Sequence, residues 1–340
     1  MTVANRASPI DPKKLLQREF TAVGLKPKDA FHTLPEWWEE AVAHPSGVFE
    51  VRGFVAKHFG LEIGPDGRLC QRLMPHACFK TRTGTDISEV ASARSMATAV
   101  AKVVASVTTT PWAGSLPSAA QLRAVAIANG NTPWVGLDDL LDACWSNGVP
   151  VVYMPSLPVA KSKMDGMVTF CGGRPVILVT KRASAPAWML FVLAHEMGHV
   201  AESHLDQCEG GAIVDEKVSE KDGDADEQER AANAYALQVL TGGEKGNIRL
   251  SRLMDAASLA DTALRFGRTN GIDPGHVILN AVKNSPVNGK EPWSLGNAAL
   301  KHIGEDVPTT GMCREALRRN IDASALSDDS FEFLERIGLL

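Results

Sequence analysis

The sequence predicts an α+β protein in which a small mixed or antiparallel sheet packs with two helices, flanked by helical regions on both sides. Short β-rich runs bounded by Pro and Gly predict the strands, at Val151–Met154, Met167–Cys171 and Val176–Thr180. Two segments with apolar residues at helical spacing predict the central helix pair, one running through His199 and one ending at Gly242. Short strands among long helices favour the α+β class.

Residues 1–110 are predicted to form a helical N-terminal region. Helical spacing of apolar residues predicts helices over residues 34–43, 46–58 and 87–107. Thr33, with Glu36 three residues later, has the pattern of a capping box at the start of the first. The prolines and the glycine within Thr108–Ser118 predict a linker, so we place a domain boundary there.

The charge of this N-terminal region is too weak to predict DNA binding. It carries 14 Lys and Arg against 11 Asp and Glu. Two short neighbouring helices are compatible with a helix-turn-helix, and a plain helical bundle explains them equally well. Nucleic-acid binding is therefore compatible with the sequence but unsupported by it.

Residues 119–243 are predicted to form the α+β unit, and residues 244–340 a small helical bundle packed on it. A helix over Leu137–Trp145 precedes the strands, and the turn Cys171–Pro175 predicts a hairpin with an edge strand open to an extended peptide. Ser184 and Pro186 precede the first central helix. In the tail, helices are expected over residues 250–266, 274–282, 293–302, 313–320 and 330–337.

Bulk properties favour a cytoplasmic, membrane-free protein. The net charge is only -5, and the N-terminal stretch lacks the apolar core of a secretory signal. The longest uninterrupted apolar run, Ala187–Ala194, is far shorter than the roughly 20 residues of a membrane span. Six scattered cysteines without a C-x-x-C pair are expected to be free thiols: Cys70, Cys78, Cys144, Cys171, Cys208 and Cys313.

One segment carries recognisable chemistry, the H-E-x-x-H pattern from His195 to His199. Residues four apart share a helix face, so the two imidazoles are expected to grip one Zn²⁺. Glu196 lies beside that pair, where it can take a proton from a metal-activated water. The structural alternative is that both histidines are satisfied by hydrogen bonds in the core.

The third ligand is expected on the second central helix. A metzincin would need glycine and histidine where Glu202 and Leu205 stand, so that class is excluded. Glu229 has the helical phase that fits best, with Asn233 one turn later to orient a ligand. Glu227 and Asp226 are rivals in a stretch, residues 200–230, with 11 Asp and Glu against 3 Lys and Arg.

Two further residues have possible roles near this site. His204 follows the motif and is either an oxyanion donor or an exposed loop residue. Cys171, at the hairpin tip, is either a resting-state cap on the zinc or a small buried side chain.

Taken together, these residues resemble the ImmA/IrrE family of bacterial regulatory metallopeptidases over about Trp134–Gly242. The resemblance rests on the strand at Gly148–Met154, the Asp165-Gly166 turn, and two helical motifs, Phe191-x-x-Ala194-His195-Glu196-x-Gly198-His199 and Glu229-x-x-Ala232-Asn233-x-Tyr235-Ala236. Tyr235 stands where the family usually has Phe, and Gly242-Gly243 where a Pro is usual. Neither departure touches an expected ligand.

The resemblance implies a gluzincin-like fold with His195, His199 and Glu229 as zinc ligands and Glu196 as catalytic base. It also implies cleavage of a helix-turn-helix transcriptional repressor in a stress, mobile-element or phage-defence circuit. Two other functions remain open: a non-catalytic regulator that binds DNA or a repressor on this scaffold, and zinc-dependent hydrolysis of a small molecule. An intact Glu196 favours catalysis, since a scaffold needs no base beside its metal.

Overall fold

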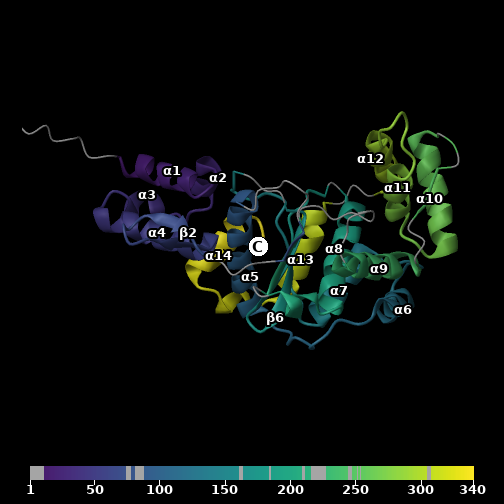
Figure 1. Ribbon diagram of the computed structural model, residues 1–340, viewed down its shortest axis with the longest axis horizontal. Coiled ribbons are helices and arrows are strands. Elements are labelled where there is room, and N and C mark those ends of the chain that lie inside the picture. Colours follow the sequence, from purple (N-terminus) through teal and green to yellow (C-terminus); the bar gives the residue numbers. More distant parts are fainter. Residues whose placement is uncertain are drawn as a thin grey trace, which may run out of the picture.

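The computed structural model describes most of the chain in one elongated arrangement. It describes residues 11–73, 78–80, 88–160, 164–183, 185–208, 211–215, 227–243, 247–250, 252, 254–304 and 308–340. The N-terminal helices lie at one end, a mixed sheet lies in the middle, and three C-terminal helices lie at the other end (Figure 1). The α+β class predicted from the sequence is confirmed.

The N-terminal helices pack around α4. The elements are α1 (Pro12–Ala22), α2 (Pro27–His32), α3 (Trp38–Ala41), α4 (Pro45–Phe59), the hairpin β1 (Leu61–Ile63) and β2 (Leu69–Gln71), and α5 (Ser88–Val107). Gly60 ends α4 in the left-handed conformation with φ of 67°, as its position after the helix predicts.

The expectation of a helix over residues 34–43 is wrong, because within this range only the four residues of α3 are helical. Thr33 does not start a helix. Its hydroxyl donates to the carbonyl oxygen of Ala30 and so closes α2 instead.

The middle of the chain contains two helices and most of the sheet. The expected linker is followed directly by α6 (Ala119–Asn129), which the sequence analysis missed although Ser118 and Gln121 form a complete capping box. The helix α7 (Leu137–Ser146) follows as predicted.

A five-stranded mixed sheet forms the centre, in the order β3-β7-β5-β6-β4. Its strands are β3 (Cys78–Lys80), β4 (Val151–Tyr153), β5 (Gly166–Cys171), β6 (Arg174–Val179) and β7 (Ala212–Asp215). The predicted hairpin is confirmed: β5 and β6 pair antiparallel across Gly172 and Gly173, which both have positive φ. The expected edge strand is wrong, since β7 covers one side of this hairpin and β4 the other.

Two helices on one side of this sheet carry the sequence motifs. They are α8 (Pro186–Ala201), which packs on β5 and β6, and α9 (Glu227–Thr241), which packs on α8. The helix α5 contacts the same two strands, and the sheet lies between α5 and α8 (Figure 1). Asp224, with Glu227 three residues later, has the sequence pattern of a helix cap for α9, but Asp224 lies outside the described residues.

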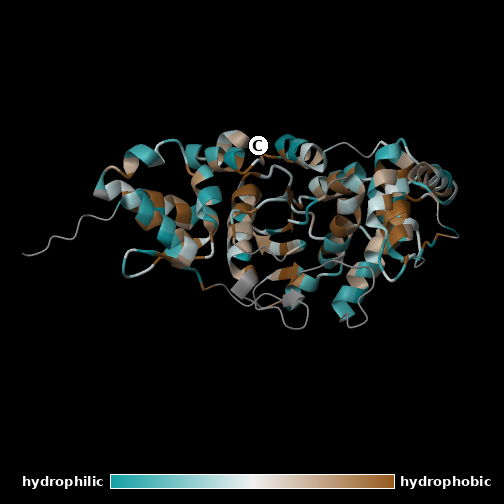
Figure 2. Cartoon of the chain, turned by 90° about the horizontal axis from the view of Figure 1, so that it is seen from above, coloured by the Kyte–Doolittle hydropathy of each residue, from teal (hydrophilic) through white to brown (hydrophobic). Residues whose placement is uncertain are grey.

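The C-terminal residues do not form one bundle, which corrects that expectation. A second apolar core unites α10 (Ala256–Asn270), α11 (Pro274–Lys283) and α12 (Trp293–His302) with Ala185 and Ala187 at the start of α8. In contrast, α13 (Thr309–Asn320) and α14 (Asp328–Arg336) join the main core beside the sheet and the N-terminal helices. Hydrophobic residues occur in the central strands and helices and also in the helices at both ends of the molecule (Figure 2). The domain boundaries themselves stay predictions.

The structure qualifies two expectations, the absence of a membrane span and the free state of all six cysteines. The window Val90–Val107 of α5 is long and apolar enough to cross a membrane, but 72% of it is buried inside the protein, as in a core helix. Cys70, Cys144, Cys171 and Cys313 are free thiols as expected, whereas Cys208 is disulfide-bonded, so the expectation was wrong for that residue. Because a disulfide weakens the argument from cysteine usage, the cytoplasmic location stays a prediction.

Close packing between α8 and α9 depends on Gly198. A Cβ at this position would lie 2.8 Å from Cα of Ala232 and 2.9 Å from its carbonyl oxygen, and backbone atoms of α9 cannot move aside alone. Gly198→Ala should therefore push the helices apart and lower the free energy of unfolding by about 1–3 kcal/mol. Gly53→Ala, in α4 with no atom within 4 Å of the added Cβ, is the matched control. It should be neutral or stabilising in the same urea titration; equal losses in both variants would contradict the packing argument.

Burial of His58 makes the N-terminal region sensitive to acid. Its Nδ1 donates to the carbonyl oxygen of Phe54 at 2.9 Å, and its ring packs against Phe333. Burial lowers the pKa of His58 from 6.5 to about 4. Since the unfolded chain binds this proton more readily, the stability contribution is complete above pH 6.5 and is lost as the pH falls towards 4.

The loss should amount to about 2–3 kcal/mol between pH 7 and pH 4.5. Urea unfolding of the wild type and of His58→Gln at both pH values measures it. The variant should lose less stability on acidification than the wild type, and parallel pH profiles would show that His58 is not responsible.

Candidate metal centre

The helix α8 presents His195 and His199 side by side. The residues are four apart, so both imidazoles leave the same face, and neither side chain is exposed to solvent. Their Nε2 atoms lie 3.1 Å apart. Two nitrogens at this separation, pointing at the same space, are arranged to share one cation.

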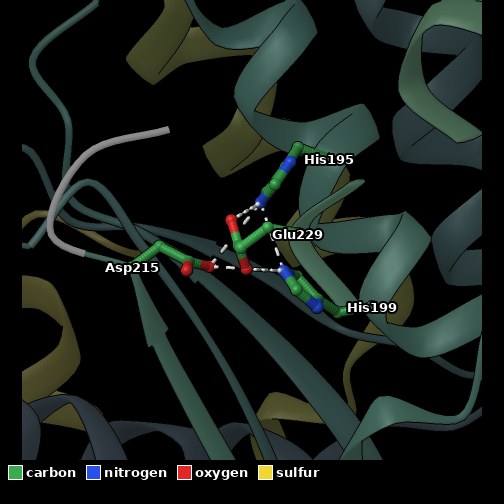
Figure 3. A group of neighbouring side chains, drawn as sticks. All are labelled: His195, His199, Asp215 and Glu229. Carbon is green, nitrogen blue, oxygen red and sulfur yellow. Dashed lines mark hydrogen bonds and ion pairs between the residues drawn. The ribbon is translucent and has the colours of Figure 1, made fainter. Parts of the chain in front are cut away.

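Two carboxylates from other elements complete the group (Figure 3). Glu229, in the first turn of α9, places Oε1 3.3 Å from Nε2 of His199 and Oε2 3.6 Å from Nε2 of His195. Asp215, the last residue of β7, places Oδ2 3.6 Å from Nε2 of His199 and 3.8 Å from that of His195. One ligand atom from each of the four residues lies within 4.8 Å of the others.

These spacings fit a single tetrahedral ion. Ligands about 2.0–2.1 Å from such an ion lie about 3.3 Å from one another. The imidazole–imidazole and imidazole–carboxylate distances run from 3.1 to 3.8 Å. Two imidazoles with two carboxylates suit Zn²⁺, although such donors also accept other divalent metals. The residues therefore form a candidate metal centre.

The electrostatics of the buried group also call for a cation. Burial, followed by the neighbouring His199, lowers the pKa of His195 to about 3, so its imidazole is in the neutral, ligating form at pH 7. Burial raises the pKa of Glu196 well above its ordinary value, and Asp215 and Glu229 raise it further. Three carboxyl groups this close repel one another in a site without solvent, and a divalent ion offsets that repulsion.

Glu196 stands beside the metal group, in space that a glycine leaves open. Its side chain is fully buried, and among the described residues neither carboxylate oxygen has a hydrogen-bond partner. A Cβ on Gly166, the first residue of β5, would overlap the Glu196 carboxylate. Gly166 pairs with Asp215 across the sheet, so the β5–β7 register sets Asp215 close to Glu196. A side chain at residue 166 would displace the expected base.

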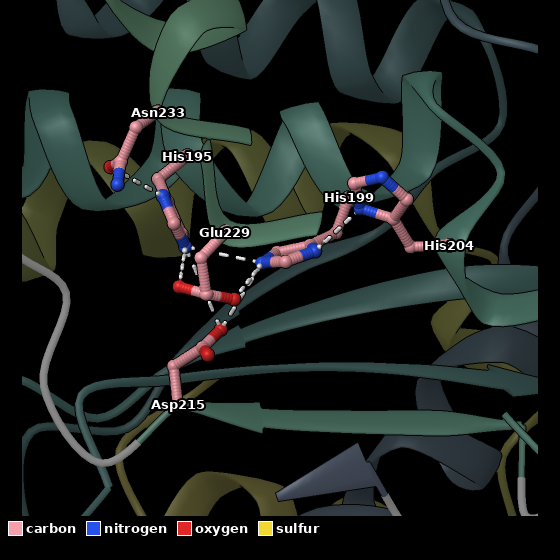
Figure 4. Close-up of polar contacts among 6 residues, drawn as sticks. All are labelled: His195, His199, His204, Asp215, Glu229 and Asn233. Carbon is pink, nitrogen blue, oxygen red and sulfur yellow. Dashed lines mark hydrogen bonds and ion pairs between the residues drawn. The ribbon is translucent and has the colours of Figure 1, made fainter. Parts of the chain in front are cut away.

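The outer nitrogen of each imidazole is held by a neighbouring side chain (Figure 4). Nδ1 of His195 lies 3.1 Å from Oδ1 of Asn233, which is the orienting contact expected from the sequence. Nδ1 of His199 lies 2.9 Å from Nδ1 of His204. Such contacts fix the ring orientation and leave Nε2 for the metal.

The structure separates several alternatives left open by the sequence. His204 is buried, not exposed, and it lies behind His199 as a positioning residue. Glu227 is exposed at the start of α9 and is not among the clustered ligand atoms, while Asp226 lies outside the described residues. Cys171 is at the far end of β5 from Gly166, about 17 Å along an extended strand, so it cannot cap the metal.

Asp215 is the residue that the sequence analysis missed. It lies in the acidic stretch of residues 200–230, yet it is only 1% exposed. The signal available was the apolar run Ala212–Val214 directly before it, which forms β7. A carboxylate at the end of a buried strand is a candidate ligand even within an acidic stretch.

Fold and site together define an α+β protein with a metallopeptidase-type centre: H-E-x-x-H on one helix, a glutamate on the next, and an aspartate from the sheet. Residues 144–243 match the Peptidase_M78 family, described as an IrrE N-terminal-like domain. This segment is similar to that peptidase domain, and it contains the four clustered residues and Glu196. No curated protein matches the chain.

Proposed function

We propose that this protein is a zinc-dependent endopeptidase whose substrate is a protein, namely a helix-turn-helix transcriptional repressor. The observation that carries the proposal is the buried Glu196 beside the His195–His199–Asp215–Glu229 group, within a segment that matches a peptidase family. The repressor as substrate, and a role in transcription regulation, rest on the resemblance to the ImmA/IrrE family.

The residues divide into a metal-holding set and a proton carrier. His195, His199 and Glu229 would hold the ion, which when bound polarises the scissile carbonyl and lowers the pKa of water to about 7. Glu196 accepts the proton of the attacking water and later delivers it to the leaving amine nitrogen.

Asp215 has a separate part in this proposal. Catalytic zinc sites keep three protein ligands and one open position, whereas sites with four protein ligands are closed. With Asp215 in place, four side chains supply donor atoms that all lie within 4.8 Å of one another. If all four side chains held an ion, no position would remain for water, so we infer that the Asp215 carboxylate would have to move away before the site could act.

A scaffold that only binds DNA or a repressor is the competing function. Such a scaffold has no use for a buried carboxyl group among two others, since that arrangement costs stability. The space that Gly166 leaves for Glu196 likewise favours a catalytic group.

The decisive experiment combines metal content with cleavage. Purified wild type, His195→Ala and Glu229→Ala are analysed for bound metal, with Glu227→Ala as the matched control at the exposed start of α9. Near-stoichiometric zinc in the wild type and the control, lost in both ligand variants, is expected. Each protein is then incubated with candidate helix-turn-helix repressors and with small amide substrates, and the products are identified by mass spectrometry.

Cleavage of a repressor by the zinc-loaded wild type alone would support the proposal. If Glu229→Ala retains its zinc, Asp215 and not Glu229 is the third ligand. Hydrolysis of small amides without any cleavage of folded or unfolded protein would contradict endopeptidase activity and indicate a small-molecule hydrolase. A folded wild type that takes up no added zinc would overturn the proposal that the protein is a zinc enzyme.

A further inference from the structure

A cavity of about 820 Å³ lies away from the metal centre, among α4, β2, α5 and the start of α14. These elements lie together on the other side of the sheet from α8 and α9 (Figure 1). Its volume is within the range of about 300–1,000 Å³ typical of small-molecule sites. Residues from both the N-terminal and the C-terminal parts of the chain line it, so it exists only in the folded protein.

Among the described residues, the charged side chains that line this cavity are all cationic. Lys57 at the end of α4, Arg72 just after β2 and Lys102 on α5 approach from three separate elements. Within the described part of the chain, no carboxylate pairs with any of these three side chains. Three unneutralised cations around one space favour a ligand of more than one negative charge.

Hydroxyl groups supplement these cations. Ser327 and Ser330, at the start of α14, lie 3.5 and 3.2 Å from Nζ of Lys57. On α5, Thr98 and Lys102 share one face of the helix, since they are four residues apart. Thr98 is only 8% exposed, and its Oγ1 has no hydrogen-bond partner among the described residues, which is costly unless a ligand or water supplies one.

The remaining walls are apolar. Leu61, Val103 and Leu326 line the cavity, and Leu73 at its rim is 94% exposed. A site built only for inorganic phosphate has no need of such surface. Cations on several sides with apolar walls between them fit an organic molecule that carries a compact dianion.

We propose that this cavity binds a small phosphomonoester, with the phosphate among Lys57, Arg72 and Lys102 and an apolar body against the leucines. Binding would join α4, α5 and α14, three segments far apart in the sequence. The site is independent of the proposed peptidase activity, and its test involves no metal.

Phenyl phosphate is a suitable probe, because it combines a dianionic phosphate with an apolar ring. Isothermal titration calorimetry of the full-length protein is performed with phenyl phosphate, inorganic phosphate and phenol. The variants are Arg72→Ala and Lys102→Ala, and the matched control is Lys301→Ala, an exposed lysine on α12 outside the cavity. Thermal unfolding of every variant confirms that it folds.

Phenyl phosphate should bind one site per chain, and each cavity variant should weaken binding about tenfold or more, while Lys301→Ala leaves it unchanged. Inorganic phosphate should bind more weakly, and phenol should not bind. No binding of phenyl phosphate at millimolar concentration would overturn the proposal, as would equal weakening by the control. If phenol binds as tightly as phenyl phosphate, the cavity is an apolar pocket and the phosphate site is wrong. If inorganic phosphate binds as tightly, the apolar walls do not contribute to binding and the proposed organic ligand is wrong.

Discussion

Glu196→Gln should abolish hydrolysis while leaving the metal in place. Glutamine has the size of glutamate but cannot accept a proton at neutral pH, so the loss should be about 10²- to 10⁴-fold in kcat. The four clustered ligand atoms belong to other residues, and metal content should therefore remain that of the wild type. The amide also removes one of three neighbouring carboxyl groups, so the metal-free variant should unfold at a higher temperature than the metal-free wild type.

The measurement pairs kcat on a cleaved substrate with zinc analysis of the same preparations. Glu202→Gln is the matched control, because Glu202 is exposed and directly follows α8. It should leave both quantities unchanged. If Glu196→Gln retains its zinc and still cleaves at the wild-type rate, the role assigned to Glu196 is wrong.

Asp215→Ala should keep the metal and raise activity. Three donors, His195, His199 and Glu229, remain after the substitution, and the open position becomes available to water. Affinity for zinc should fall by about 10–100-fold, as is typical when a supporting group is lost, while His195→Ala loses the ion altogether. We expect a severalfold rise in kcat for zinc-saturated Asp215→Ala.

Cobalt substitution provides a readout besides activity. The visible absorption of Co²⁺ depends on the number and type of its ligands. The spectrum of Co²⁺-loaded Asp215→Ala should therefore differ from that of the Co²⁺-loaded wild type. Asp215→Asn keeps the shape of the side chain and removes its charge, so it separates the effect of losing the charge from the effect of losing the side chain. Loss of metal in Asp215→Ala would make Asp215 an indispensable ligand, and retained metal with lost activity would make it part of the catalytic machinery.

Several features could be predicted from the sequence because their signals are local. The spacing of His195 and His199 places both imidazoles on one face of any helix, whatever surrounds it. Gly172 and Gly173 define the β5–β6 turn, since both adopt positive φ. Glu229 and Asn233 share one face of α9 because they are four residues apart, whereas the contact of Asn233 with His195 also requires that α9 pack on α8. Where a local signal was misread, as at Thr33, a hydrogen bond to the preceding turn prevailed over a capping pattern.

Local sequence patterns were sufficient to predict the α+β class, the two helices that carry the motif, and the chemical character of the site. The folded chain was needed to show that β5 and β6 lie inside the sheet, and that the pairing of Gly166 with Asp215 brings a second carboxylate to the histidines. The cationic cavity likewise depends on Lys57, Arg72 and Lys102 meeting from separate elements. The physical reason is common to these cases: helix faces and turns are set by residues a few positions apart, whereas strand neighbours and cavities are set by contacts across the whole chain.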